Sequence, residues 1–320
     1  MTTPEPERPD HGPAVVPSAS LSRGEGGPIV FGPYVSVQVN VDGVGADILG
    51  DAANEPSIAI DPTDPRRMAI GWREFSSVSS NFRQAGVAYS ADGGMTWIFP
   101  GVLTPGVFRS DPVLGSDAAG NLYYSSLTHQ PGNINAFEVS VFKSADGGVT
   151  WSPPVYAYGG DKQWLVVDDR PAGVGAGNIY QFWNVQFSCC DRDDFARSVS
   201  GGSVFEVSLP LPEPSMKWGT MDVGPDGILY AVGSDLNQAG HLFTRSLDAL
   251  DSLSTPTFSP VTAIDLGGLT GGFSGFAGPN PQGLLGQVWI AAHPFKADRV
   301  YALASVTRPG VDPCDLMFSR

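Results

Sequence analysis

The sequence predicts an all-β fold, a β-propeller of four-stranded antiparallel blades, from three observations. Forty glycines and 28 prolines stand beside only 16% charged residues, a composition typical of short strands joined by many turns. One octapeptide recurs at a fixed distance along the chain. A strand-turn-strand pattern precedes each copy, and a third strand leads into it.

The octapeptide is a predicted turn. Residues 90–97 read SADGGMTW and residues 144–151 read SADGGVTW, so that Asp146 follows Asp92 by 54 residues. The glycines accept positive φ, and the aspartate side chain caps nearby backbone N–H groups, as a hairpin turn requires. Decayed copies follow at 198–205 and 243–248. We therefore expect purely structural roles for Ser90, Asp92, Gly94, Thr96, Trp97, Ser144, Asp146, Gly148, Thr150 and Trp151.

The strand-turn-strand pattern occurs five times, in residues 58–72, 113–124, 165–183, 221–230 and 289–301. With the third strand, the turn and a fourth strand, each unit makes a blade of about 50 residues. The predicted blades are 54–104, 110–157, 161–212, 217–265 and 285–320, within one propeller domain covering 29–320. Residues 1–28 are rich in proline and glycine, and we predict that they are disordered.

The last predicted blade is incomplete. Phe318-Ser-Arg320 matches Phe195-Ala-Arg197 and Phe243-Thr-Arg245, the strand ends that lead into a turn. We therefore expect the fifth blade to lack its turn and fourth strand, and the chain to be a fragment of a longer propeller that associates with itself or with a complementary fragment. The alternative is that residues 34–41 add a strand to the last blade and close a five-bladed ring.

Charge and hydropathy exclude several classes of partner. The net charge is −15, with 33 acidic against 18 basic residues, which argues against binding to nucleic acid or anionic lipid. No apolar stretch approaches the roughly 18 residues of a membrane span. The N-terminus lacks the apolar segment of a signal peptide, so the sequence leaves the compartment open, and export would need a start further upstream.

No cofactor or metal site is predicted, because the four histidines and three cysteines lack zinc-ligand spacing. Cys189 and Cys190 are adjacent. We expect two free buried thiols there, a strained vicinal disulfide being the alternative.

The octapeptides match Ser-x-Asp-x-Gly-x-Thr-Trp and resemble the Asp-box, or BNR repeat, of the sialidase superfamily. The opening at residues 54–61 also looks like bacterial Asp-box proteins, and the resemblance covers about 54–320. It implies a propeller whose boxes lie on the periphery, away from any active site. A sialidase of this family uses three arginines, a tyrosine nucleophile with a glutamate partner, and an aspartate acid/base. Its Phe/Tyr-Arg-Ile-Pro element is absent here, so no catalytic residue is carried over.

A ligand site is expected where the loops enter the innermost strands, at the mouth of a propeller channel. Aligning the blades on their first turns pairs Asn54-Glu55 with Ser110-Asp111, Asp161-Lys162 and Lys217-Trp218. Converging charges and aromatic rings can bind a sugar or a cation, although the same residues can also be solvated strand ends or core. The candidates are Asn54, Glu55, Arg109, Asp111, Asp161, Lys162, Trp164, Arg170, Lys217 and Trp218.

These observations predict a non-catalytic Asp-box propeller that binds a glycan or a protein. The alternative is a glycoside hydrolase of the exo-α-sialidase type, which the family resemblance alone favours.

Overall fold

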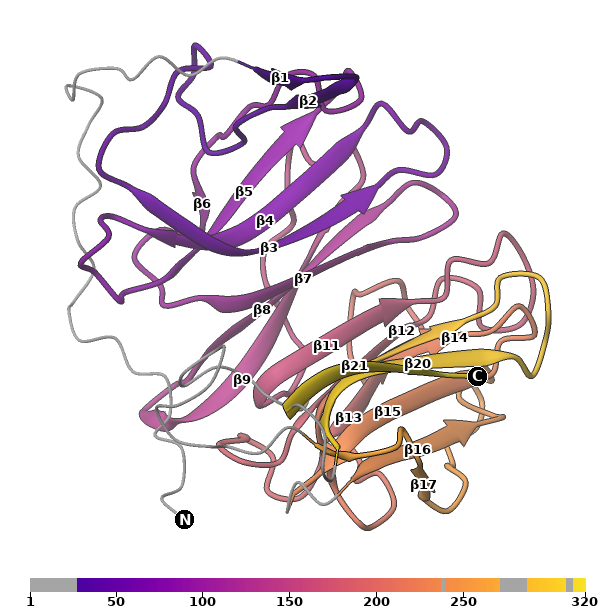
Figure 1. The fold of residues 1–320 in the computed structure, drawn as a ribbon. Coiled ribbons are helices and arrows are strands. Elements are labelled where there is room, and N and C mark those ends of the chain that lie inside the picture. The colour runs from indigo at the N-terminus through magenta and orange to yellow at the C-terminus, as the bar shows by residue number, and fades with distance from the viewer. Residues whose placement is uncertain (1–27, 237–239, 271–286, 309–312) are drawn as a thin grey trace. The chain divides into compact units, whose positions relative to one another are not determined.

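The computed structural model describes residues 28–236, 240–270, 287–308 and 313–320. Within these ranges there is no helix, and hence none long and apolar enough to cross a membrane. The strands form five antiparallel sheets and a separate hairpin (Figure 1). The all-β prediction is confirmed. The predicted disorder of residues 1–28 falls, except for residue 28, outside the described ranges.

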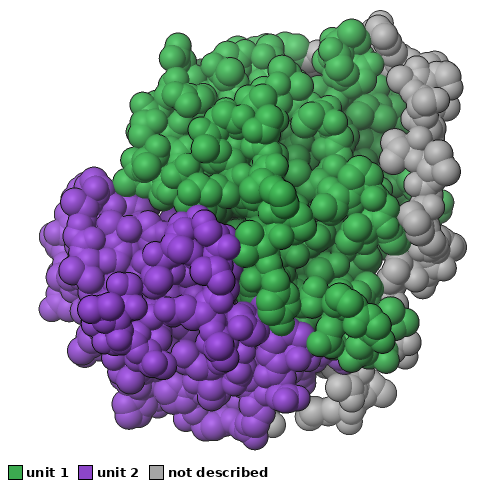
Figure 2. Space-filling model, turned by 180° about the vertical axis from the view of Figure 1, so that it is seen from behind, with its two compact units in different colours: residues 1–157 green, residues 158–320 purple. Residues whose placement is uncertain are grey.

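The chain divides into two compact units, residues 1–157 and residues 158–320, which are described separately (Figure 2). Unit 1 contains the β1–β2 hairpin, sheet 1 in the order β3-β4-β5-β6, and sheet 2 in the order β7-β8-β9-β10. Its strands are β1 (Ile29–Phe31), β2 (Tyr34–Ser36), β3 (Ala52–Ile60), β4 (Met68–Phe75), β5 (Gln84–Ser90), β6 (Val102–Leu103), β7 (Ser110–Ser116), β8 (Leu122–Gln130), β9 (Asn133–Ser144) and β10 (Val155–Tyr156).

Sheets 1 and 2 share an apolar core. Val87 of sheet 1 and Leu114 and Tyr124 of sheet 2 are all buried in it. A side chain at Gly71 would bring its Cβ within 2.4 Å of the Tyr124 ring, so the close contact requires glycine. Alternate residues of each strand supply this core, as half-buried antiparallel strands require.

Unit 2 contains sheet 3 (β11-β12-β13), sheet 4 (β14-β15-β16-β17) and sheet 5, in which β20 lies between β21 on one side and β18 and β19 on the other. Its strands are β11 (Asp161–Val167), β12 (Ile179–Asn184), β13 (Phe195–Ser198), β14 (Met216–Val223), β15 (Leu229–Asp235), β16 (His241–Ser246), β17 (Thr262–Ile264), β18 (Leu269–Thr270), β19 (Val288–Ala292), β20 (Val300–Thr307) and β21 (Pro313–Ser319). One core joins sheets 3 and 4, and another joins sheets 4 and 5.

Two sheets of unit 2 differ from the expected pattern. In sheet 3 the fourth strand is reduced to a single bridge between Phe195 and Leu209. Pro210 and Pro212 follow directly, and proline cannot donate to a strand ladder. Sheet 5 includes β18, which precedes the range predicted for the fifth blade.

The register of unit 2 places β21 as the third strand of sheet 5. Phe195 pairs with Phe182, Phe243 with Val232, and Phe318 with Leu303. Each partner is the fourth residue of the second strand of its sheet or, in sheet 5, of β20. Within the described ranges β20 is the strand that pairs with β21. Residues 34–36, part of the segment predicted as the alternative means of closing the ring, pair with Ile29–Phe31 in a two-stranded hairpin.

Both octapeptides fold into the same hydrogen-bonded turn. Asp146 Oδ1 accepts the Thr150 amide at 2.9 Å, and its Oδ2 accepts the Thr150 hydroxyl at 2.6 Å. Ser144 Oγ accepts the Gly148 amide, and the Trp151 indole donates to the Gly148 carbonyl. Residues 90–97 make the same four bonds at nearly the same lengths. The aspartates are therefore occupied within their own loops.

The decayed copies keep part of this turn. Ser200 stands in the aspartate position and accepts the Val204 amide at 3.1 Å. In the fourth copy Asp248 again accepts both an amide and a hydroxyl, but from Thr257, nine residues away. An insertion therefore separates the aspartate from its partner, which hides the motif from a fixed-spacing comparison.

The prediction of two free thiols is wrong, because Cys189 and Cys190 form a disulfide. Their loop is pinned to Gly159: the Ser188 hydroxyl and the Cys189 amide both donate to the Gly159 carbonyl, at 2.9 and 3.3 Å. The Cys190 amide donates to Ser188 Oγ at 3.0 Å. These bonds fix the loop that carries the disulfide against Gly159.

Candidate functional site at the bulged strand ends

The first strand of each of sheets 1 to 4 carries a β-bulge at the same place. The pairing register skips after Asn54, Ser110, Asp161 and Lys217. The next residue in each case, Glu55, Asp111, Lys162 or Trp218, has φ between 48° and 53°. Non-glycine residues rarely adopt this left-handed conformation, and such positions gather at functional sites. The alignment on the first turns therefore identified four structurally equivalent positions.

In unit 1 the bulge of sheet 1 is held by an arginine on the neighbouring strand. Arg73 donates from Nε to Asn54 Oδ1 at 2.7 Å, and its Nη2 pairs with Glu55 Oε1 at 2.7 Å. Arg73 is buried, whereas the Glu55 side chain is 38% exposed. Asn54 and Glu55 are thus brought together, and their charge is balanced locally.

Asp111 and Arg109 are buried near the bulge of sheet 2. Ser110 donates its hydroxyl to Asp111 Oδ1 at 2.6 Å. The Arg109 guanidinium donates to Thr104 Oγ1 and lies 5.1 Å from the centroid of the Phe142 ring. Burial lowers the pKa of Arg109 to about 10. Both side chains therefore belong to the packed interior of unit 1, not to an open rim.

Unit 2 links two bulges through one asparagine. Asn184 donates from Nδ2 to Asp161 Oδ2 at 3.3 Å, and its Oδ1 accepts the Trp218 amide at 2.8 Å. Asn184 is buried, whereas Asp161 and Lys162 are half-buried. The amide side chain fixes the bulge of sheet 3 against that of sheet 4.

The Lys217 ammonium group also has partners within the protein. Its Nζ donates to the Leu236 carbonyl at 2.9 Å and lies 4.3 Å from the centroid of the Trp218 ring. Burial lowers the pKa of Lys217, and the Asp235 carboxylate opposes this shift. Both Lys217 and Trp218 are buried, so Trp218 is a packing residue with no ring face open to a ligand.

Trp164 takes part in an aromatic pair that the sequence did not reveal. Its ring lies edge-on to Trp289, with centroids 4.6 Å apart. Trp289, on β19, is 53% exposed. Trp164 follows Lys162 by two residues on β11, so the aromatic pair includes a residue of the strand that carries the charged bulge.

Arg170 lies at the other end of its sheet. It follows β11, whose first residue is Asp161, and makes a two-pronged ion pair with Asp168, from Nε at 2.8 Å and Nη2 at 2.6 Å. Nη2 also donates to the Val174 carbonyl. The expectation that Arg170 lies on the same rim as Asp161 is wrong, because the whole length of the strand separates them.

Sequence reasoning missed Arg73, Asn184 and Trp289. A signal existed for the first two residues. In each sheet the first turn joins the first and second strands, and counting residues away from that turn along both strands pairs Arg73 with Asn54 and Asn184 with Asp161. Trp289 meets Trp164 only through tertiary packing, which no spacing along the chain shows.

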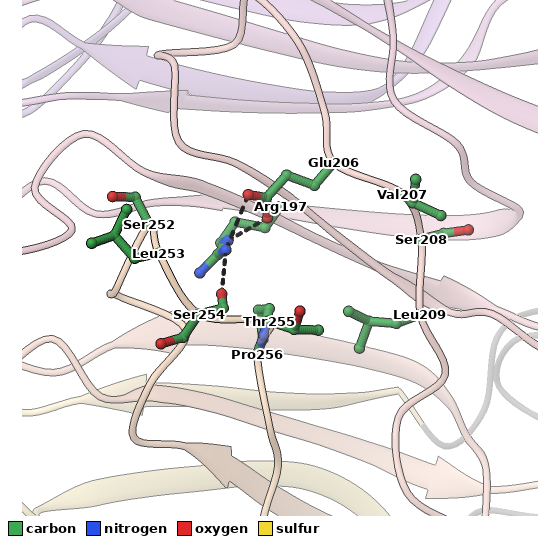
Figure 3. A pocket seen from close by; sticks show the side chains of 10 residues that line it. All are labelled: Arg197, Glu206, Val207, Ser208, Leu209, Ser252, Leu253, Ser254, Thr255 and Pro256. Atoms are coloured by element: carbon green, nitrogen blue, oxygen red, sulfur yellow. Dashed lines mark hydrogen bonds and ion pairs between the residues drawn. The ribbon is translucent and has the colours of Figure 1, made fainter.

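Unit 2 also has a surface groove of about 410 Å³ (Figure 3). Its walls are residues 206–209 and the insertion at 252–256. Arg197 at its base uses every N–H: two bonds go to Glu206 and three to the carbonyls of Ala249, Asp251 and Ser254. The arginine therefore joins the two walls and retains no donor for a ligand.

Comparisons with known proteins identify the fold. No protein-family model and no curated protein matches the chain. The intramolecular trans-sialidase of Ruminococcus gnavus superposes with a TM-score of 0.52 and 11% identity, over 83% of this chain and 80% of that one. A mutant NanB sialidase from Streptococcus pneumoniae gives 0.51 and 10%, over 83% and 58%. The Hadza microbial sialidase Hz136 gives 0.50 and 13%, over 85% and 53%.

The fold is sialidase-like. Sialidases are β-propellers, and the four-stranded antiparallel sheets of this chain correspond to that architecture. At 10 to 13% identity the likeness concerns the fold alone. The chain spans just over half the length of two of these sialidases. Activity must therefore be argued from the site.

Proposed function

We propose that this chain is a non-catalytic, sialidase-like module that binds carbohydrate at the bulged strand ends of unit 2. The observation that carries the proposal is the half-exposed Trp289 ring, packed on Trp164, which lies on the same strand as Asp161 and Lys162. An aromatic face beside a few fixed polar groups is the usual make-up of a small-molecule site. A sugar can stack its C–H face on the indole while its hydroxyls meet the carboxylate and the ammonium group.

The turns support the narrower assignment to the Asp-box propellers. Residues 90–97 and 144–151 share both the sequence and the hydrogen bonds that the aspartate, serine and threonine make. Such turns stabilise a blade and leave chemistry to other residues.

Four tyrosines of the chain are poorly suited to the nucleophile role of sialidase chemistry. A tyrosine nucleophile needs a lowered pKa, yet burial raises the pKa of Tyr123, Tyr124 and Tyr230, and raises that of Tyr180 to about 12. The alternative function, an exo-α-sialidase-type hydrolase, therefore requires a nucleophile other than these four tyrosines.

Binding to immobilised neutral and sialylated glycans tests the proposal. We expect Trp289→Ala to weaken binding by about tenfold or more, because the stacking surface is lost. Phe295→Ala is the matched control. Phe295 is also an exposed aromatic residue, but it comes after the last residue of β19, whereas Trp289 lies near the first. Equal binding by both variants, or no glycan bound by the wild type, contradicts the proposal. Turnover of a fluorogenic sialoside would favour the hydrolase.

A second candidate is binding to a protein, either another copy of this chain or a complementary propeller fragment. Leu316 and Phe318, on one side of β21, are 67% and 60% exposed. Met317, on the opposite side, packs into the core between sheets 4 and 5. One side of β21 is thus buried as in a stacked sheet, while the other offers apolar side chains to a partner.

A further inference from the structure

The Cys189–Cys190 disulfide lies in the loop that joins β12 to β13, beside the bulge of sheet 3. Both cysteines are half-buried, so a small reductant can reach them. Ser188 connects the loop to its surroundings: its Oγ accepts the Trp183 indole N–H at 3.1 Å and donates to the Gly159 carbonyl at 2.9 Å. The disulfide is therefore covalently adjacent to the residue that ties the loop to the strand.

The backbone at Gly160 is packed so closely against Trp183, Asn184 and Ser188 that no side chain fits there. A Cβ at Gly160 would come within 2.6 Å of both the Asn184 carbonyl and the Trp183 ring, and within 3.1 Å of Ser188 Cβ. Asp161 follows at once and pairs with Asn184. The loop residue Ser188, Gly160 and Asn184 are thus closely packed, and the Asn184 side chain bonds to Asp161 and to the Trp218 amide.

The loop is built from backbone conformations that need support. Tyr158, Phe187 and Asp191 have φ of 60°, 60° and 54°, and Lys162 has φ of 53°. Phe187 and Asp191 belong to the loop itself, whereas Tyr158 and Lys162 flank Gly159 and Gly160 at the start of β11. Left-handed non-glycine residues persist only where the surrounding structure fixes them. A covalent bond between residues 189 and 190 supplies such a constraint between Phe187 and Asp191.

We propose that the Cys189–Cys190 disulfide is a redox-controlled latch on the bulged site of unit 2. In the oxidised form the loop is pinned to Gly159, and Asn184 holds Asp161 and Trp218. A dithiol reductant attacks one sulfur through its thiolate, forms a mixed disulfide and closes its own disulfide, leaving two cysteine thiols in the protein. The freed loop leaves Gly159, and the Asn184 contacts loosen. The part of this inference that concerns control of glycan binding rests on the proposed function.

Thiol counting and hydrogen exchange test the latch without any ligand. The denatured chain should show one reactive thiol before treatment with dithiothreitol and three after it, because the chain has three cysteines. In the folded protein, reduction should speed exchange of the Cys189 and Trp218 amides by about tenfold or more. The Gly148 amide, which donates to Ser144 Oγ in unit 1, should not change.

Variants separate the disulfide from the third cysteine. C189S/C190S should exchange like the reduced wild type, and C314S should respond to dithiothreitol like the wild type. If C189S/C190S does not fold, hydrogen exchange of the wild type with and without reductant still tests the latch. Three thiols before reduction, or unchanged exchange at Trp218 on reduction, would overturn the proposal. Failure of the wild type to bind 3′-sialyllactose or lactose would contradict the proposed function while leaving the exchange result intact.

Discussion

At the scale of single residues, the side chains of this protein are mostly occupied by local partners. Burial raises the pKa of Asp146, but hydrogen bonds from Thr150 and Ser144 outweigh it and leave the pKa below its ordinary value. Hydrogen bonds from Thr96 and Ser90 lower the pKa of Asp92 to about 2. A carboxylate so fully bonded stabilises its turn and is poorly suited to proton transfer.

Asp146→Ala should lower the free energy of unfolding by about 1–2 kcal/mol, since bonds to the Thr150 amide and hydroxyl are lost. Chemical denaturation measures the change. Val149→Ala is the control, because Val149 is exposed in the same turn and makes no side-chain hydrogen bond. Glycan binding by the folded variant should equal that of the wild type; a stable variant that lost binding would contradict the structural role.

Glu74 makes stability depend on pH. Burial raises its pKa to about 7, although the Trp72 indole donates to the carboxylate. The folded state then binds more protons than the unfolded state between roughly pH 4.5 and 7, so unfolding free energy falls as pH rises through that window. Glu74→Gln should flatten this slope and raise stability at pH 8 by on the order of 2 kcal/mol.

Asp194 contributes in the same direction, because burial raises its pKa to about 7 despite the bond from the Leu211 amide. Adding Asp194→Asn should flatten the slope further. Denaturation curves between pH 5 and 8 measure both effects. An unchanged slope in the double variant would show that neither carboxyl is protonated on folding.

At the scale of elements, the repeated bulge is the feature that shapes the site. It adds a residue to the first strand of the sheet, and the backbone of the added residue leaves the hydrogen-bonded ladder. In sheets 1 and 2 the bulge is completed by Pro56 and Pro112, which cannot donate to a ladder. The charged or aromatic side chain is thereby placed at the strand end, at the cost of a left-handed φ.

Lys162→Gly should leave the unfolding free energy within about 0.5 kcal/mol of the wild type, because glycine accepts positive φ. Lys162→Val should lower it by about 2 kcal/mol, since a β-branched residue is strained there. Val166, a packed residue of the same strand, should favour valine over glycine, so that Val166→Gly lowers the free energy of unfolding. Thermal unfolding compares the three variants, and equal effects of glycine and valine at 162 would contradict the assigned backbone.

At the scale of the whole molecule, net charge and exposed apolar side chains have opposite effects on self-association. A charge of −15 keeps copies apart at low salt. The exposed side of β21 favours association once that repulsion is screened.

Light scattering at increasing salt should therefore show self-association that L316K/F318K suppresses. Val78→Lys is the control, because Val78 is exposed elsewhere, in unit 1. A wild type that stays monomeric at every salt concentration would argue against a partner on this side of β21.

The sequence by itself determined the all-β class, the turn motif and the equivalent bulge positions, because these depend on short-range signals. Glycine at positive φ, aspartate caps and alternating apolar residues act within a few neighbours, so spacing along the chain reveals them. The match of Phe318-Ser-Arg320 to the third strands at 195–197 and 243–245 followed from the same repeat.

Only the tertiary structure decided which candidates are exposed. Arg109, Asp111, Lys217 and Trp218 occupy repeat positions like that of Lys162, or adjoin them, yet all four are buried. Exposure depends on what packs against a strand end, and the partners here come from other strands: Phe142 for Arg109, and Asn184 for Trp218. The Trp164–Trp289 pair and the Cys189–Cys190 disulfide likewise depend on contacts or loop conformation that residue spacing does not encode.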